Sequence, residues 1–203
     1  EYKQNRKDKY ATQTEAEKQA FIDFFDEYEE TLELLSEEYK VLRFKGVEAD
    51  DLAAHLVKQK EEYKLNNIWL VSSDRDWDLL IQEGVSRFSY VTRKEITIDN
   101  WSEHYNVTPE EYISFKCLTG DKGDNVPGIN GIGPKRAEQL IKDYGDAMNI
   151  YDNIPLDGKY KYIQELNQNA DILLKNYELM DLITYCDDAI GTDNVSEIQG
   201  RMI

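Results

Sequence analysis

Seven acidic residues stand in three separated blocks of this 203-residue chain, and together they could bind divalent cations. Carboxylate oxygens without His or Cys beside them suit Mg²⁺ or Mn²⁺ better than zinc. Two such cations held close together can activate water and stabilise the charge that develops on a phosphate ester, so no protein nucleophile is needed. The sequence therefore predicts two-metal hydrolysis of a phosphodiester. The candidate metal ligands are Glu48, Asp50, Asp51, Asp74, Asp76, Asp121 and Asp124.

Each acid on its own also has a simpler interpretation. Asp50 could cap a helix, Asp78 could be a solvated helix residue, and Asp124 could form a turn. The joint placement favours a shared site, because in an open parallel sheet ligands gather outside the carboxyl ends of the strands. So many converging carboxylates would repel strongly unless cations lay among them.

The predicted elements that position these acids alternate between strand and helix. A short strand at 41–44 precedes Glu48, a helix runs from Asp50 to about Lys60, and a buried strand at 68–71 precedes the second block. Alternating apolar residues at 86–92 and 95–98 predict an antiparallel extension. The alternation predicts an α/β fold with a mainly parallel sheet flanked by helices.

Two capping boxes mark further helices. Thr14 and Glu17 start a long helix, and we expect its apolar stripe to pack in the core. Thr108 and Glu111 start the helix that leads into the third acidic block. Beyond Pro155 the pattern is helical. The apolar stripe of the first helix consists of Phe21, Phe24, Phe25, Tyr28, Leu32 and Leu35.

A glycine-punctuated turn follows the third acidic block. Gly131 and Gly133 permit tight backbone conformations, and Pro134 suits the first turn of the next helix. The amide groups at such a helix start point towards an anion, and Lys135 and Arg136 stand beside them. The pattern is typical of a helix-hairpin-helix, which holds a nucleic-acid backbone without reading its sequence.

The formal net charge of −17 argues at first sight against a nucleic-acid partner. Part of the acid stands at the candidate metal positions, however, and much of the rest lies at 26–30 and 36–38, apart from the basic clusters. We therefore expect binding to depend on local basic patches and on metal. The basic clusters are Lys3, Arg6, Lys7 and Lys9, then Arg93 with Lys94, and Lys135 with Arg136.

The cysteines and histidines show no spacing typical of a metal site. Cys117 and Cys186 stand far apart, and we interpret His55 and His104 as ordinary surface or helix residues. We find no apolar run of membrane-spanning length and no signal peptide. These observations predict a protein of the reducing cytoplasm.

Four blocks of the sequence resemble the motifs of the structure-specific 5′-nucleases, a family that includes the flap endonucleases and the 5′-nuclease domains of bacterial DNA polymerases. The resemblance lies in residues 2–6, 47–53, 72–78 and 120–128, which occur in the family's order. Residues 159–163 and 184–186 are most similar to the exonucleases of the T-odd coliphages.

The resemblance implies a PIN-like nuclease core with a helical arch and a helix-hairpin-helix subdomain. It divides the chain into a core with part of the arch at 1–110, a DNA-binding hairpin subdomain at 111–150, and a C-terminal helical segment that packs on the core at 151–203. It further implies a monomeric 5′-3′ exonuclease and flap endonuclease, located in the host cytoplasm if viral. Its substrates would be DNA with 5′ flaps, nicks or free 5′ ends, and RNA–DNA hybrids.

The same resemblance assigns roles to basic residues that would otherwise be interpreted as a solvated basic face. It implies that Lys3 reaches the scissile phosphate and that Arg6 contacts the 5′-phosphate or flap, so both are expected to be catalytic. The family's hairpin also coordinates K⁺ through main-chain carbonyls. The expected DNA-binding residues are Lys3, Arg6, Lys7, Gly131, Gly133, Lys135 and Arg136.

Because the sequence opens inside the family's arch, we expect a portion of a longer protein, without two upstream metal-binding aspartates and therefore impaired in catalysis. Two other functions were weighed from the residues. A non-catalytic helix-hairpin-helix protein would have no reason to place Asp74 and Asp76 directly after a buried strand. A PIN-type ribonuclease shares the acidic α/β scheme but lacks the arch and the hairpin.

Overall fold

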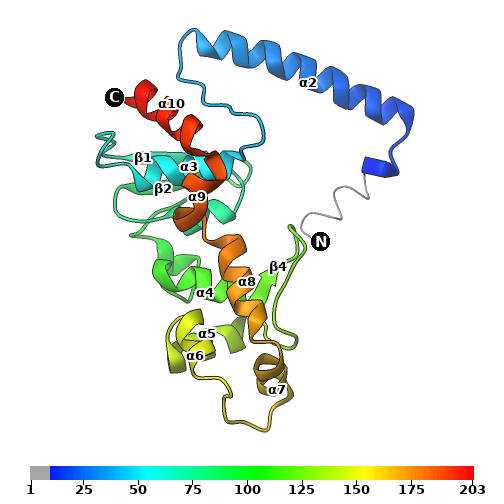
Figure 1. The fold of residues 1–203 in the computed structure, drawn as a ribbon, viewed down its shortest axis with the longest axis vertical. Helices are drawn as coiled ribbons and strands as arrows, with labels where there is room; N and C mark the ends of the chain where they lie inside the picture. Colours follow the sequence, from blue (N-terminus) through cyan, green and yellow to red (C-terminus); the bar gives the residue numbers. More distant parts are fainter. Residues whose placement is uncertain (1–9) are drawn as a thin grey trace.

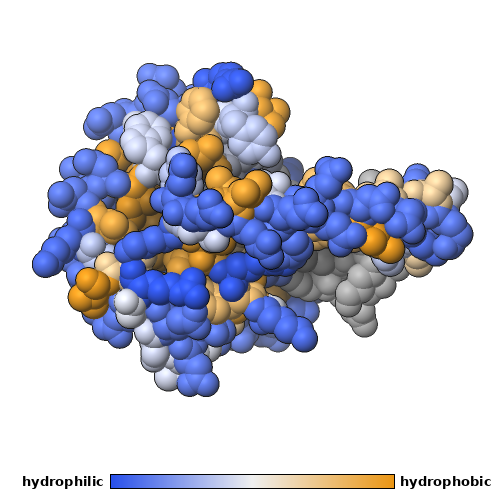
Figure 2. Space-filling model, turned by 90° about the horizontal axis from the view of Figure 1, so that it is seen from above, coloured by the Kyte–Doolittle hydropathy of each residue, from blue (hydrophilic) through white to orange (hydrophobic). Residues whose placement is uncertain are grey.

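The computed structural model describes residues 10–203, and its first long element is α2 (Glu15–Ser36), which extends clear of the rest of the molecule (Figures 1 and 2). The predicted capping box is confirmed: the Thr14 amide donates to the Glu17 carboxylate at 2.8 Å. The expectation that the apolar stripe packs in the core is wrong, because no residue of α2 is buried. Phe24, for example, is 59% exposed. The rings pack on one another instead, with the Phe21 and Phe25 centroids 4.7 Å apart.

The segment after α2 is irregular chain, so the strand predicted at 41–44 is wrong. The Val41 carbonyl accepts a hydrogen bond from the Arg201 side chain, and the Lys40 ammonium donates to the Arg201 carbonyl. Leu42 and Phe44 pack against a small core around Ile198. Contacts with the C-terminal helix α10 (Thr192–Met202) therefore take the place of strand pairing.

The sheet with three strands has the order β1–β2–β3 and lies beside α3 (Figure 1). Strands β1 (Ile68–Val71) and β2 (Val85–Ser89) pair in parallel, and β3 (Lys94–Ile96) pairs antiparallel to β2, which confirms the predicted extension. The expected mainly parallel sheet is wrong in detail, because within residues 10–203 the sheet is small and mixed and the chain is mostly helical. Strand β1 is also less buried than predicted: Leu70 faces the core, while Trp69 and Val71 are exposed.

Helices make up most of the remaining structure. The predicted starts of α4 at Thr108, and of α5 with its end at Gly145, are confirmed. The largest core cluster unites α4, α5, α6 and α8 around Leu118, Ile150 and Leu173. In chain order the remaining bounds are α3 (Ala49–Lys58), η1 (Asp76–Leu80), η2 (Trp101–Glu103), α4 (Pro109–Thr119), α5 (Pro134–Tyr144), α6 (Ala147–Asp152), α7 (Lys161–Gln168), α8 (Asp171–Met180) and α9 (Leu182–Ile190).

A short hairpin of β4 (Gly120–Asp121) and β5 (Val126–Pro127) carries the third acidic block. Its strands approach so closely that a Cβ on Gly120, where φ is +73°, would lie 2.2 Å from the Gly128 amide. The buried side-chain amide of Asn176 on α8 donates to the carbonyls of Cys117 and Pro127 at 2.9 and 2.8 Å. The hairpin is thereby fixed to the helical core.

Two buried polar groups differ from the sequence interpretation. His55 lies on a helix as expected but is buried, and its ring nitrogens contact Asp187 at 2.7 Å and Tyr63 at 2.9 Å. Asp78 is not solvated: it is buried in η1, where its carboxylate pairs with Arg87 and accepts from Tyr105. Within residues 10–203 no helix is long and apolar enough to cross a membrane.

Candidate metal centre and nucleic-acid interface

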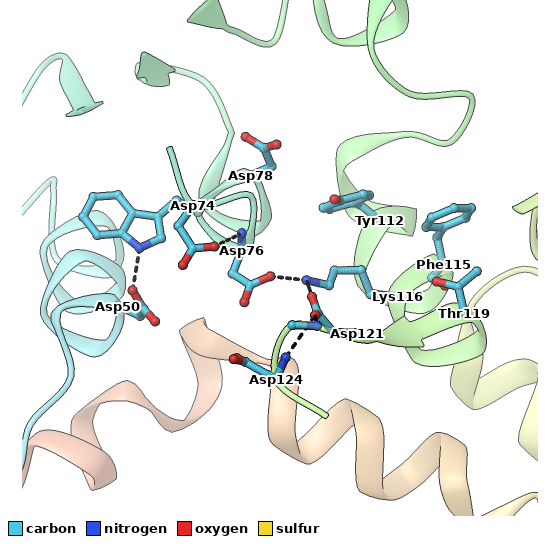
Figure 3. A network of polar contacts seen from close by, with 12 residues as sticks. Asp50, Asp74, Asp76, Asp78, Tyr112, Phe115, Lys116, Thr119, Asp121 and Asp124 are labelled. Atoms are coloured by element: carbon cyan, nitrogen blue, oxygen red, sulfur yellow. Dashed lines mark hydrogen bonds and ion pairs between the residues drawn. The ribbon is translucent and has the colours of Figure 1, made fainter. Parts of the chain in front are cut away.

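Six of the seven candidate metal ligands line a single cavity of about 360 Å³. The walls come from the start of α3, from η1, from the β4–β5 hairpin and from the α8–α9 junction, which are far apart in the sequence (Figure 3). Among the seven, Asp74 alone does not line the cavity. The residues from the predicted set are Glu48, Asp50, Asp51, Asp76, Asp121 and Asp124.

The first acidic block stands at the N-terminus of α3. Glu48 is the N-cap residue, so it follows irregular chain rather than the predicted strand. Asp50 and Asp51 lie in the first turn, where the helix dipole favours negative charge. One Asp50 oxygen accepts a hydrogen bond from the Trp77 indole at 2.6 Å (Figure 3). This bond links α3 to η1 and orients the Asp50 carboxylate.

The second block follows β1, as predicted. Asp74 accepts a hydrogen bond from the Asp76 amide at 3.0 Å, which shapes the turn into η1. Asp76 itself is partly buried, and burial raises the pKa of its carboxyl more than the nearby Lys116 ammonium lowers it. Burial thus makes the charged form of Asp76 costly unless a cation lies beside it.

Lys116 on α4 is that cation, and it was missed by sequence reasoning. Its ammonium bonds to the Asp76 carboxylate and lies 3.0 Å from Asp121, with only 6% of the residue exposed (Figure 3). Burial alone would lower the pKa of Lys116, but the charge of Asp76 and the bonds to both carboxylates raise it. The only signal was its position on the helix that leads into the third block.

The third block lies in the turn of the β4–β5 hairpin. One Asp121 oxygen accepts from the amides of Gly123 and Asp124 at 2.7 and 3.3 Å. Although burial opposes ionisation, these amides and Lys116 outweigh it and lower the pKa of Asp121. Asp121 is therefore held in its charged form at the cavity wall.

The cavity contains the oxygen ligands of a divalent-cation site, but its carboxylates do not lie close enough together to form a complete coordination shell. Within residues 10–203 no three acidic, His or Cys side chains form a ready ligand group. Lys116 instead bridges Asp76 and Asp121, and so supplies the positive charge that this cavity needs. All-oxygen donors from three blocks suit Mg²⁺ or Mn²⁺.

The predicted phosphate grip lies at the start of α5. Gly131 has φ +81°, whereas Gly133 is the extended N-cap residue that leads into Pro134. Lys135 is exposed with no ion pair in the part of the chain that the structure describes. The Arg136 guanidinium donates to the Gly131 carbonyl and lies 4.5 Å from the Tyr162 ring centroid. Arg136 therefore ties the turn to α7, while Lys135 faces solvent.

Lys3, Arg6 and Lys7 lie outside the described residues. Their expected roles at the scissile phosphate and along the DNA stay predictions.

Comparison with known proteins shows the family of the chain. Residues 107–199 match the family described as 5′-3′ exonuclease, C-terminal SAM fold. The flap endonuclease of Escherichia phage T5 is 45% identical over 192 residues, which are 94% of this chain and 66% of the relative. The chain thus spans just under two thirds of that relative's length.

Two solved structures of the T5 protein share the fold. A crystal form with metal ions has a TM-score of 0.94 at 42% identity, covering 99% of this chain and 77% of the other. A complex with DNA and metal ions has a TM-score of 0.91 at the same identity, covering 99% and 75%. The chain belongs to the 5′-3′ exonuclease and flap endonuclease family. Among these relatives it is similar to the flap endonuclease of phage T5 over nearly all of its length.

Proposed function

We propose that the protein is a structure-specific 5′-nuclease that uses divalent metal ions. Its substrates would be DNA with 5′ flaps, nicks or free 5′ ends, and RNA paired with DNA. The observation that carries the proposal is the cavity where three separated acidic blocks meet around a buried lysine. The T5 relative was crystallised with metal ions and with DNA, and the same kinds of partner are proposed here.

Two or more Mg²⁺ or Mn²⁺ ions would occupy this cavity. Eight carboxylates line the cavity, and the six of the predicted set supply hard oxygen ligands. Asp74 supports Asp76 by accepting a hydrogen bond from the Asp76 amide. When bound, the ions would activate water and stabilise the charge that develops on the scissile phosphate. The ammonium group of Lys116 balances part of the negative charge before the metal ions bind. Once they are bound, Lys116 must share Asp76 and Asp121 with the ions.

The protein's own cations would position the nucleic acid. Lys135, in the first turn of α5, would hold a duplex phosphate, and the Arg136 bond would keep the turn in shape. Lys3 and Arg6 would act at the scissile phosphate and the 5′ end, with Lys7 on the flap. A K⁺ ion bound by hairpin carbonyls belongs to the same proposal.

The proposed organisation keeps the predicted division into core, hairpin subdomain and C-terminal helical segment, at 1–110, 111–150 and 151–203. It also keeps a monomer that works in the cytoplasm, which is the host's cytoplasm if the protein is viral.

A 5′-flap cleavage assay with Mg²⁺ tests the proposal. We expect cleavage by the parent chain, a loss of at least a hundredfold in Asp121→Asn, and no loss in the control Asp157→Asn, whose side chain is exposed outside the cavity. Calorimetric titration with Mn²⁺ should show weaker binding in Asp121→Asn only. If the parent binds flap DNA in Ca²⁺ but does not cleave it in Mg²⁺ or Mn²⁺, the protein is a non-catalytic DNA-binding protein and the enzyme proposal is wrong.

A further inference from the structure

We call the cavity that is lined by the six predicted acids the acidic cavity. A second cavity, of about 220 Å³, shares the Ser72–Asp76 loop with it but is lined by cationic rather than acidic side chains. Four of its nine lining residues are cationic or can become so, four carry hydroxyl groups, and none is a carboxylate. We call it the basic pocket. Its cationic lining consists of Arg75, Arg87, Lys94 and His104.

Arg87 forms the rigid floor of the basic pocket. It is buried, with 4% of its surface exposed, and two of its N–H groups donate to the Asp78 carboxylate. A third donates to the Ser72 carbonyl at 2.9 Å. A guanidinium has five N–H donors, so two are left over after these bonds. Asp78 also accepts from Tyr105, and together these bonds fix the position of the guanidinium before any ligand arrives.

The other cations of the basic pocket lack carboxylate partners. Arg75, Lys94 and His104 make no ion pair and no side-chain hydrogen bond with any residue in the range 10–203. The lining of the basic pocket also contains no carboxylate that could neutralise them, although the net charge of the chain is −17. Unpaired positive charge that gathers around one concave, hydroxyl-rich site favours an anionic ligand.

We propose that the basic pocket binds a phosphate group of the nucleic-acid backbone, and the proposal rests on the nuclease function above. Phosphate oxygens accept several hydrogen bonds at once, which suits guanidinium, ammonium and hydroxyl donors on one wall. Arg75 stands between Asp74 and Asp76 in the sequence. A strand whose scissile phosphate lies in the acidic cavity would therefore have a neighbouring phosphate within reach of this loop.

Inorganic phosphate tests the pocket without metal, DNA or activity. Titrating the ¹⁵N-labelled chain with phosphate in EDTA at constant ionic strength should shift the amides of Ser73, Ser89 and Thr92 saturably. Lys94→Gln and Arg75→Gln should each weaken the Kd at these amides at least tenfold. Arg93→Gln is the matched control, because Arg93 is the exposed neighbour of Lys94 and does not line the pocket. Absence of saturable shifts, or an equal weakening in Arg93→Gln, would overturn the proposal.

Binding of flap DNA in Ca²⁺, where cleavage does not intervene, identifies the source of the phosphate. Lys94→Gln should lower the slope of log K against log salt by about 0.9, the value for one lost phosphate contact. Arg93→Gln should leave that slope unchanged. A variant that loses phosphate binding but keeps the full DNA salt slope would refute the assignment to nucleic acid. Because the phosphate titration needs no cleavage, failure of the nuclease proposal would be seen separately.

Discussion

The ammonium group of Lys116 lies among the carboxylates where positive charge is needed most. Removing one partner of a buried ion pair leaves the other charge uncompensated, which costs roughly 3–5 kcal/mol when both are fully buried. Asp76 and Asp121 keep about a quarter of their side chains exposed, at 24% and 27%, so solvent screens part of that cost. Lys116 is thus a stabilising residue of the metal-free protein.

We therefore expect Lys116→Met to lower the free energy of unfolding in EDTA by about 1–3 kcal/mol. Mn²⁺ should restore most of the loss, since a cation that binds the folded state replaces the missing charge. Urea denaturation with and without Mn²⁺ measures both effects. Lys122→Met, at an exposed neighbouring position, is the control and should change neither. Equal stability of Lys116→Met and the parent in EDTA would contradict the role of this cation.

Asp76 and Asp121 share Lys116 but have pKa values shifted in opposite directions. A lowered carboxyl pKa stabilises the fold above the ordinary Asp pKa of about 3.9, and this stability is lost as the pH falls through the folded value. A raised pKa destabilises the fold at neutral pH, and this cost disappears as the pH falls from the raised value to the ordinary one.

In EDTA at neutral pH, Asp121→Asn should accordingly lower the melting temperature and Asp76→Asn should raise it. The Asp76→Asn difference should disappear as the pH falls to about 4, whereas the Asp121→Asn difference should persist there and be lost only at lower pH. Thermal unfolding followed by circular dichroism between about pH 2 and 7 gives the comparison. Shifts of the same sign at neutral pH would show that the two carboxylates do not differ in this way.

At the residue scale, the sequence was sufficient to select six acids that line one cavity and insufficient to select their partners. The acids could be recognised from the sequence because they stand at the boundaries of elements. Lys116 and Trp77 could not be recognised, because their contacts with Asp121 and Asp50 depend on how α3, η1 and α4 pack. Asp78 was misjudged for the same reason, since its partner Arg87 stands on another element.

At the scale of elements, we expect the two cations at the start of α5 to have different roles: Lys135 binds DNA, whereas Arg136 stabilises the turn. Lys135→Ala should weaken binding of duplex DNA in Ca²⁺ uniformly across sequences and reduce the salt slope by about 0.9, with little effect on stability. Arg136→Ala should lower the stability by about 1–2 kcal/mol, because it removes both the bond to Gly131 and the contact with the Tyr162 ring. Salt series and urea denaturation on both variants separate the roles, and equal loss of stability would contradict this division.

Helix α2 does not pack against a core. It is stabilised by contacts among its own side chains and by Arg43, which pairs with Glu29 and lies over the Tyr28 ring. We expect Phe24→Ser to change the free energy of unfolding by no more than about 0.5 kcal/mol, the range for exposed substitutions. Leu173→Ala, at a fully buried position of α8, should cost about 2–5 kcal/mol. Urea denaturation of the two variants compares them. A comparable loss for Phe24→Ser would mean that the apolar stripe packs on another surface in solution.

Local signals located the helices well, because a capping box such as Thr14 with Glu17 is contained within four residues. The segment 41–44 shows the limit of such signals. Its apolar residues suit a strand, but the partner of the Val41 carbonyl is the guanidinium of Arg201, 160 positions away, rather than a neighbouring strand. A pattern in four residues does not reveal such a partner.

At the scale of the whole molecule, net charge was a poor guide and its distribution a better one. Helix α2 alone carries eight acidic residues and one lysine, it extends away from the rest of the molecule (Figure 1), and none of its residues lines the acidic cavity. Carboxylates gather in the acidic cavity and cationic side chains in the basic pocket, and the two share one loop. The overall α/β class was predictable from the alternation of elements, whereas the small mixed sheet was not, because strand partners are chosen in three dimensions.

The contacts of α10 also affect the order in which this chain folds during synthesis. The core cluster that contains Leu42, Phe44 and Leu52 is completed by Ile198 and Met202. The ribosome therefore makes the first half of this cluster long before the second. The buried residues of the largest cluster all lie between 81 and 173, so they are all synthesised before α10. Until then the apolar residues that follow α2 stay uncovered, and they are the part of the nascent chain that a chaperone would meet.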